Sequence, residues 1–184
     1  MGRSKEETSP GRRGFPLTYC SLPQDAARVH VLTAQIPGML TFLEQHYGPY
    51  PFPTAGVLFL PQMVGMETQT MITLGVEIPA DDLLHEFAHH WFGDAVSPRT
   101  WQGVWLNEGF ASFMADYSVE LDGGLTMRDW LDQSYQSLAD DKEFWALPID
   151  DPGPRHLFDG AVYVRGEMAV QALRQRIGDP AFLG

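Results

Sequence analysis

Residues 85–108 read HEFAHHWFGDAVSPRTWQGVWLNE and open with two histidines four residues apart, the first followed directly by a glutamate. On a helix, positions four apart lie one turn apart on the same face. His85 and His89 can therefore direct ring nitrogens at one ion, and zinc prefers such ligands. In the pattern H-E-x-x-H on a helix, the glutamate is the general base that takes a proton from water at the metal. The stretch predicts a zinc site on a helix over 81–92, with Glu86 as the base.

A third ligand is required, because catalytic zinc keeps three protein ligands and one open position. Glu108 is the best candidate, since we expect it to begin the next helix, where the helix dipole favours a carboxylate. Residues 93–106 supply enough chain to turn that helix back across the first. Its small side chains at Ala111 and Ala115 allow a close approach to the histidines.

The competing interpretation of 81–92 is a core helix whose histidines are merely solvated. Large apolar residues, however, surround the motif on nearly every side of this helix, among them Leu84, Phe87 and Trp91. Two histidines and a glutamate there would be partly buried, and a buried charge needs a partner. Zinc supplies that partner. Neighbouring His90 points a third of a turn away, so we expect it to pack rather than bind the ion.

The rest of the chain predicts strands early and helices late, which is typical of the α+β class. Residues 1–14 carry no large apolar residue beyond Met1, and we expect a flexible leader there. Apolar periodicity, caps and breakers predict the remaining elements. They are strands over 55–61 and 64–74, and helices over 29–47 (interrupted or kinked near Pro37-Gly38), 81–92, 107–121, 126–142 and 160–177.

Charge and composition exclude several classes of protein. The chain of 184 residues has a formal net charge of −12, and residues 1–13 carry +2, so the remainder carries −14 (−12 minus +2). Such a surface disfavours nucleic acid and suits ligands with a positive group. The single cysteine, Cys20, excludes an internal disulfide framework. Without a visible signal peptide or transmembrane segment, we expect a cytoplasmic protein; nothing in the sequence specifies an oligomeric state.

Four ordered motifs resemble those of the gluzincin zinc aminopeptidases. They are VGMET (64–68), HEFAHHWFGD (85–94), WLNEGFASF (105–113) and VYVRG (162–166), and 18 residues separate His89 from Glu108. The first is similar to the GAMEN motif of that family, and the last to its Y-x-K-G segment, with Arg165 in place of lysine. The resemblance runs from about residue 29 to the end. It implies a thermolysin-like zinc peptidase catalytic domain over 15–184, incomplete at its C-terminal end.

The family also implies a role for each matching residue. His85, His89 and Glu108 would hold one Zn²⁺ per chain, while Glu86 would activate water. Tyr163 would donate a hydrogen bond to the developing oxyanion. Glu67 would bind the free α-amine of a peptide substrate, and Gly65 and Met66 would line the cleft along an edge strand. The expected activity is release of N-terminal residues from peptides with a free N-terminus.

Two departures from the family keep other functions open. Only Met66 and Glu67 match within GAMEN, and the β-rich domain that precedes this region in the family is absent from the 184 residues. The chain is then either a fragment of a longer enzyme or a pared-down single-domain relative. The alternatives are a single-domain zinc endopeptidase with a cleft open at both ends, or an inactive zinc- or peptide-binding remnant. A remnant could lose Glu86 freely, and Glu86 is present.

Overall fold

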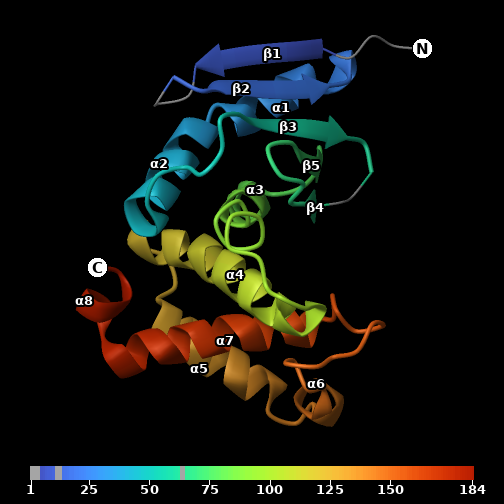
Figure 1. Cartoon of the computed structure of the whole chain (residues 1–184). Coiled ribbons are helices and arrows are strands. Elements are labelled where there is room, and N and C mark those ends of the chain that lie inside the picture. The colour runs from blue at the N-terminus through green and yellow to red at the C-terminus, as the bar shows by residue number, and fades with distance from the viewer. Residues whose placement is uncertain (1–4, 11–13, 63–64) are drawn as a thin grey trace. The chain divides into compact units, whose positions relative to one another are not determined.

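The structure is a computed structural model that describes residues 5–10, 14–62 and 65–184. It divides into two compact units, Met1–Ala95 and Val96–Gly184. The first unit contains all the strands of the described residues, and the second is helical (Figure 1). Strands therefore come early and helices late, and the α+β class expected from the sequence is confirmed.

The first unit is built on a five-stranded mixed sheet with the order β1-β2-β3-β5-β4. Its three central strands pair in parallel, and β1 and β4 pair antiparallel at the two edges. The bounds are β1 (Lys5–Pro10), β2 (Pro16–Ser21), β3 (Ala55–Leu60), β4 (Gly65–Met66) and β5 (Ile72–Gly75). The centre of the sheet is apolar, as parallel strands covered on both faces require, because Val57, Ile72 and Leu74 are fully buried.

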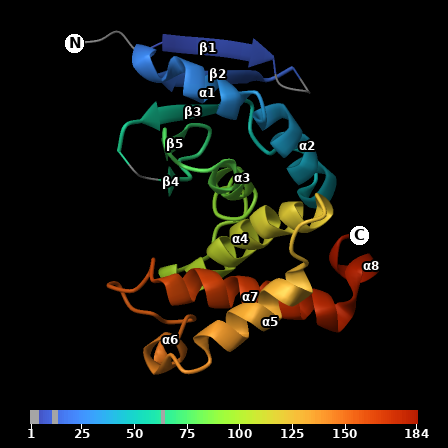
Figure 2. The same ribbon diagram turned by 180° about the vertical axis from the view of Figure 1, so that it is seen from behind.

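Helices of the first unit cover this sheet. A 3₁₀ turn, η1 (Pro23–Asp25), leads into α1 (Ala26–Thr33) and α2 (Ile36–Tyr47), and α3 (Ala80–Ala88) follows β5. Helix α1 lies across one face of the sheet, in front of β2 in Figure 2 and behind it in Figure 1. Helix α3 packs beside β4 and β5, so the edge strand lies next to the helix that carries the histidines.

The helix predicted over 29–47 is interrupted, as expected, and the break lies at Ala34-Gln35, just before Pro37-Gly38. Pro37 stands in the first turn of α2, where a proline needs no hydrogen-bond partner for its nitrogen. The single strand predicted over 64–74 is wrong. It is a hairpin, in which Gly65 pairs with Leu74 and Met66 with Thr73, while Val64 lies outside the described residues.

Strand β1 falls in the segment 1–14 that the sequence suggested as a leader. It pairs with β2 from Lys5 opposite Ser21 to Pro10 opposite Pro16. Nothing in its composition, which is polar and charged, indicates a strand.

The second unit consists of helices, of which α4 and α7 form the centre. The bounds are η2 (Trp101–Gly103), α4 (Val104–Leu121), α5 (Met127–Leu138), α6 (Lys142–Ala146), α7 (Gly160–Ile177) and α8 (Asp179–Phe182). Helices α4 and α7 lie side by side in both views and make the most extensive helix pair of the unit. They approach closely because two glycines meet: a Cβ on Gly109 would lie 2.6 Å from the backbone carbon of Gly166.

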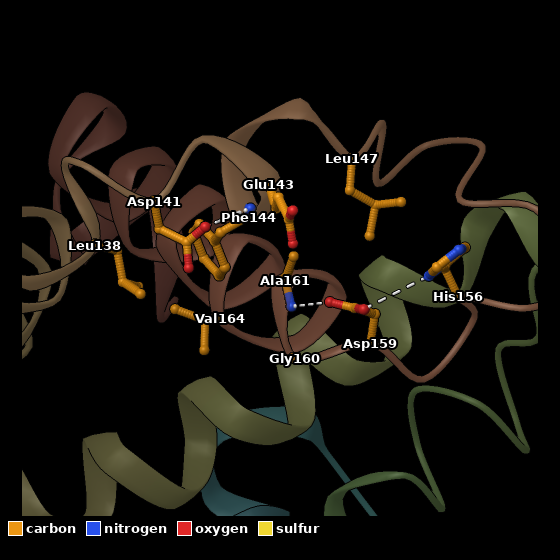
Figure 3. Close-up of a pocket in the computed structure, with 10 residues that line it drawn as sticks. All are labelled: Leu138, Asp141, Glu143, Phe144, Leu147, His156, Asp159, Gly160, Ala161 and Val164. Carbon is orange, nitrogen blue, oxygen red and sulfur yellow. Dashed lines mark hydrogen bonds and ion pairs between the residues drawn. The ribbon is translucent and has the colours of Figure 1, made fainter.

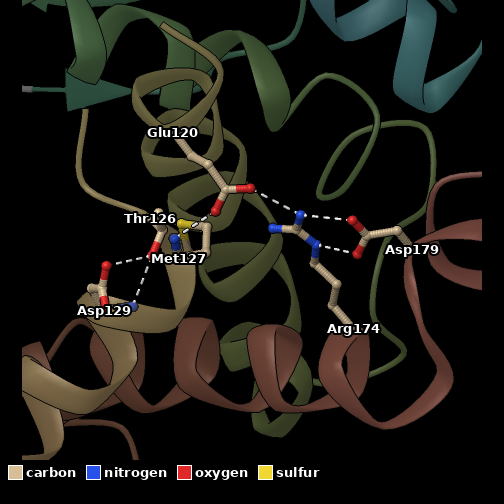
Figure 4. Close-up of polar contacts among 6 residues, drawn as sticks. All are labelled: Glu120, Thr126, Met127, Asp129, Arg174 and Asp179. Atoms are coloured by element: carbon tan, nitrogen blue, oxygen red, sulfur yellow. Dashed lines mark hydrogen bonds and ion pairs between the residues drawn. The ribbon is translucent and has the colours of Figure 1, made fainter. Parts of the chain in front are cut away.

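A polar network joins the far ends of these helices (Figure 4). Arg174 of α7 donates to the carboxylates of Glu120 on α4, at 2.9 Å, and of Asp179 on α8, at 2.8 Å. The guanidinium also lies 4.6 Å from the ring centre of Tyr117. Glu120 in turn accepts from the Met127 backbone at the start of α5. One arginine thus ties together the ends of four helices.

Helix α7 has the predicted bounds, but three other helices differ from the prediction. Helix α3 begins at Ala80 and ends at Ala88, short of the predicted end at residue 92, and its N-cap residue Pro79 makes no side-chain bond. Helix α4 begins at Val104, three residues before the expected start. The helix predicted over 126–142 is α5 followed by the separate helix α6. In the described part of the chain, no helix has the length and apolar character needed to cross a membrane.

Candidate active site

His85 and His89 lie where the motif predicts, one turn apart at the end of α3. Their Nε2 atoms are 3.0 Å apart, and the rings meet edge to face at 4.7 Å. Two ligands that are each about 2.0–2.1 Å from a tetrahedral zinc would lie roughly 3.3 Å apart. The His89 Nδ1–H donates to the Phe92 carbonyl at 3.1 Å, which leaves Nε2 free of its proton to bind a metal. This pair therefore fits a zinc ion.

Glu86 lies against the edge strand. Its side chain is buried, with 8% exposed, and its carboxylate comes so close to Gly65 of β4 that a Cβ on Gly65 would overlap it. The structure therefore brings together two residues, 21 positions apart in the sequence, that the sequence assigned to catalysis and to the cleft. A carboxylate held between the zinc helix and an edge strand is placed to act on a peptide that lies along that strand.

Met66 and Glu67 continue from Gly65 at this edge. Met66 is 47% exposed, and Glu67, half-buried, directly follows the end of β4. Burial, and then the negative charge of Glu67, raise the pKa of the nearby Asp94 carboxyl to about 6. Two carboxylates that repel one another would both be stabilised by a cationic group bound between them.

His90 is fully buried, as expected for a packing residue, and it also makes a specific hydrogen bond. Its Nδ1 lies 2.9 Å from the hydroxyl of Tyr50, which itself donates to the Thr54 carbonyl at 3.1 Å. Burial lowers the pKa of His90 to about 4, so the ring is neutral at pH 7. The bond holds the turn that directly follows His85 and His89.

Glu108 and Tyr163 belong to the second unit. Glu108 is buried in the second turn of α4, with 3% exposed, whereas the sequence placed it at the start of that helix. The helix dipole therefore acts on it less than expected. Tyr163 lies in the first turn of α7, three residues before Gly166, and the contact between Gly166 and Gly109 adjoins Glu108.

The sequence model of the peptidase family M1 domain matches residues 33–183, which is most of the chain. The chain belongs to peptidase family M1. The match confirms the resemblance to the zinc aminopeptidases that the four motifs indicated.

Named relatives of this M1 chain are aminopeptidases. Human aminopeptidase RNPEPL1 is 30% identical over 181 residues, which cover 88% of the chain and 25% of the relative. Aminopeptidase N of Streptomyces lividans is 28% identical over 188 residues, covering 86% of the chain and 21% of the relative. The chain thus spans about a quarter of the length of these relatives.

The M1 zinc metallopeptidase of Deinococcus radiodurans has a similar structure, with a TM-score of 0.79 and 28% identity. The match covers 98% of this chain and 42% of that one. A mutant of that enzyme was solved with a Tyr-Ser-Ala substrate, and it matches with a TM-score of 0.77 at 27% identity.

A pocket of about 510 Å³ in the second unit of the M1 chain has no residue in common with the predicted site (Figure 3). It lies between α6 and the start of α7. Two of its acidic side chains already have structural partners, because Asp141 accepts from the Phe144 backbone and Asp159 from that of Ala161. These aspartates are helix caps. His156 pairs with Asp159 at 3.6 Å.

Sequence reasoning missed the Gly109–Gly166 contact and the proximity of Asp94 to Glu67. Both glycines stand inside the quoted motifs, GFASF and YVRG, in the interior of helices. A glycine in a helix interior costs about 1 kcal/mol relative to alanine, so two of them inside functional motifs are a usable sign of close packing. Asp94 carries no such signal, because a turn after Gly93 suits an aspartate on any surface.

Proposed function

We propose that this M1 chain carries the zinc-binding catalytic core of an aminopeptidase that releases N-terminal residues from peptides. The observation that supports the proposal most directly is the pair of facing Nε2 atoms of His85 and His89, 3.0 Å apart, with Glu86 between them in sequence. A merely structural helix has no reason to bring two imidazole nitrogens this close, because only an ion or a shared proton favours that arrangement.

His85, His89 and Glu108 would hold one zinc ion per chain, since each offers one ligand atom of the kind that zinc prefers. The 18 residues between His89 and Glu108 and the family of the chain support this assignment. Zinc bound there would polarise the scissile carbonyl and lower the pKa of the attacking water.

The remaining residues would bind the substrate and move protons. Glu86 would take the proton of the attacking water and pass it to the leaving amine, a role that suits a buried carboxylate beside an edge strand. Tyr163 would donate its hydroxyl hydrogen to the oxyanion of the tetrahedral intermediate. Gly65 and Met66 would lie along the peptide backbone, since β4 is at the edge of the sheet.

Glu67 would fix the position of the cut by pairing with the free α-ammonium of the substrate. The effect of its charge on Asp94 supports this role, because a positive group between two such carboxylates relieves their repulsion. The substrates would therefore be peptides with a free N-terminus. The named relatives are aminopeptidases, and one structural neighbour was solved with a tripeptide.

The test compares free and N-acetylated reporter peptides by kcat/KM, in the natural chain and in Glu67→Ala. We expect acetylation to lower kcat/KM by about 10- to 100-fold, since it leaves a half-buried carboxylate unpaired. Glu67→Ala should remove most of this discrimination. Equal rates on both peptides would reject the aminopeptidase and support the zinc endopeptidase instead.

Metal analysis separates both enzymes from the third possibility, a remnant without turnover. The chain should bind one zinc, His89→Ala should bind none, and His30→Ala, which changes an exposed histidine on α1, should bind as the natural chain does. Zinc binding without hydrolysis of either peptide would identify a remnant.

The cytoplasmic location stays a prediction, which fractionation of the source cells tests.

A further inference from the structure

Glu167 is a buried acid that the proposed reaction does not use. It lies on α7 with 4% of its surface exposed, and its Oε1 has no hydrogen-bond partner among the described residues. Burial, and then the charge of Asp116 on α4 and a side-chain hydrogen bond with it, raise the pKa of Glu167 to about 10. Two carboxyl groups can form a hydrogen bond only if one of them carries a proton. Glu167 is therefore protonated at pH 7 and donates to Asp116.

The cationic side chains of the helices around Glu167 are engaged elsewhere or exposed. Arg174, two turns further along α7, is held by Glu120 of α4 and Asp179 of α8, and Arg165 donates to carbonyls at the end of α6. Gln171, one turn along, is neutral and buried. The charged side chains of α5 and α6 are exposed: Arg128, Asp129, Asp132, Lys142 and Glu143. No cation therefore replaces the proton on Glu167 among the described residues.

The position of this pair connects it to the proposed chemistry. Glu167 follows Tyr163 by four residues, so both lie on one face of α7. It also follows Gly166, whose contact with Gly109 sets the separation of α7 from the helix that carries Glu108. On α4, Asp116 follows Gly109 by seven residues, which is two turns along the same face.

We infer that Asp116 and Glu167 share one proton, and that this hydrogen bond positions Tyr163 by holding α7 in register against α4. Steric contact between the glycines limits how near the helices come, and the carboxyl pair prevents them from sliding past one another. Glu167 is a positioning residue that acts through α7. Its effect on catalysis rests on the roles proposed for Tyr163 and Glu108, whereas the shared proton does not.

A proton held by Glu167 predicts how the stability of the folded state depends on pH. An acid whose pKa is higher in the folded than in the unfolded state binds its proton more tightly when folded. The folded state therefore loses stability as pH rises from about 4.5, the ordinary value, towards about 10. Glutamine at this position donates to Asp116 at every pH and has no proton to lose.

The first measurement is urea unfolding of the 184-residue chain from pH 5 to 9. The unfolding constant of the natural chain, divided by that of Glu167→Gln, should rise with pH by up to about tenfold per unit. Glu143→Gln, which changes an exposed glutamate of the same unit, should give a ratio independent of pH above 6. A pH-independent ratio for Glu167→Gln as well would overturn the shared proton.

Carboxyl carbon NMR provides a second test that needs no unfolding. One glutamate carboxyl signal of the natural chain should keep the chemical shift of a protonated acid from pH 5 to 8, where exposed glutamates are ionised, and it should be missing from Glu167→Gln. If every glutamate signal titrates below pH 6, the inference fails.

Activity on an aminoacyl reporter tests the positioning role. We expect Glu167→Gln to retain kcat within about threefold, and Glu167→Ala to lose about 10- to 100-fold in kcat at unchanged zinc content, since misplacement of about 1 Å can cost that much. Equal kcat in both variants would reject the positioning role. Tyr163→Phe isolates the proposed function: if its kcat is unchanged, the role of Tyr163 is wrong, while the unfolding and NMR results still decide the shared proton.

Discussion

Helix α3 and the α4–α7 crossing supply the proposed chemistry in two different ways. On α3 and its C-cap, five consecutive positions contain both histidines and the glutamate proposed as the base, and the helical repeat alone brings them together. At the crossing, Glu108 and Tyr163 stand 55 positions apart, and their helices meet through Gly109 and Gly166. Chemistry contained in one turn of helix can be inferred from spacing, whereas chemistry that depends on two packed helices requires the packing to be known.

The largest expected effect comes from removing the proposed base on α3. Glu86→Gln keeps the shape of the side chain and removes the base, so kcat should fall by about 10²- to 10⁴-fold while one zinc stays bound. Steady-state kinetics and metal analysis of the same preparation measure both. The exposed variant Glu143→Gln is the matched control and should leave kcat unchanged. Loss of zinc together with activity would mean that Glu86 supports the ligands rather than the reaction.

A smaller effect is expected when the close contact between α4 and α7 is disturbed. Gly166→Ala adds a Cβ that would lie 2.5 Å from the Trp105 carbonyl and 3.2 Å from the Cα of Gly109, and backbone atoms cannot move aside cheaply. Unfolding free energy should fall by about 1–3 kcal/mol, as overpacking usually costs. Gly160→Ala is the control on the same helix, because its Cβ meets nothing within 4 Å.

Measuring kcat as well as stability in Gly166→Ala and Gly160→Ala tests whether the α4–α7 contact affects the reaction separately from the histidines of α3. Gly166→Ala should lower kcat and leave zinc binding by His85 and His89 in place, because those ligands come from α3. Gly160→Ala should change neither quantity. Equal stabilities for the two variants would show that the close approach of α4 and α7 is not limited by these glycines.

The fold was predictable where one local signal dominates. The apolar run of β3 and the helical pattern over 160–177 gave bounds close to those of β3 and α7. The hairpin of β4 and β5 was not predictable, because its turn places Thr70 at a φ of 64°. Threonine rarely adopts that conformation, so no turn signal stands in the sequence, and the alternation over 64–74 continues as though one strand were present.

The start of α4 illustrates the same limit at the site itself. Asn107 is a good N-cap residue, and it favoured a start just before Glu108. The helix begins at Val104 instead, after the 3₁₀ turn η2, and Gly103 at its N-cap makes no side-chain bond. A Cβ on Gly103 would lie 2.7 Å from Pro98, so packing of the preceding loop fixes this start. Tertiary contact outweighed the local preference.

Thr126 at the start of α5 is the local signal whose loss should matter least. Its hydroxyl accepts from the Asp129 backbone at 3.1 Å and donates to the Asp129 carboxylate at 2.8 Å, as is typical of an N-cap threonine with an acidic residue three positions later. Thr126→Ala should lower the unfolding free energy by about 1 kcal/mol and leave kcat unchanged, because a cap acts on its own helix. Ser137→Ala removes an exposed hydroxyl from the same helix and should cost less than about 0.5 kcal/mol.

Thr126→Ser retains the cap and should recover most of the loss. The neighbouring Met127 nitrogen donates to Glu120, which Arg174 also binds, so α5 is connected to the end of the crossing. If Thr126→Ala costs well over 2 kcal/mol, or lowers kcat, the cap supports that network. The distinction between a local signal and a packed contact would then fail at α5. If Thr126→Ala lowers the unfolding free energy by about 1 kcal/mol and Thr126→Ser recovers it, the cap acts only on its own helix, and such a local feature can be predicted from the sequence alone.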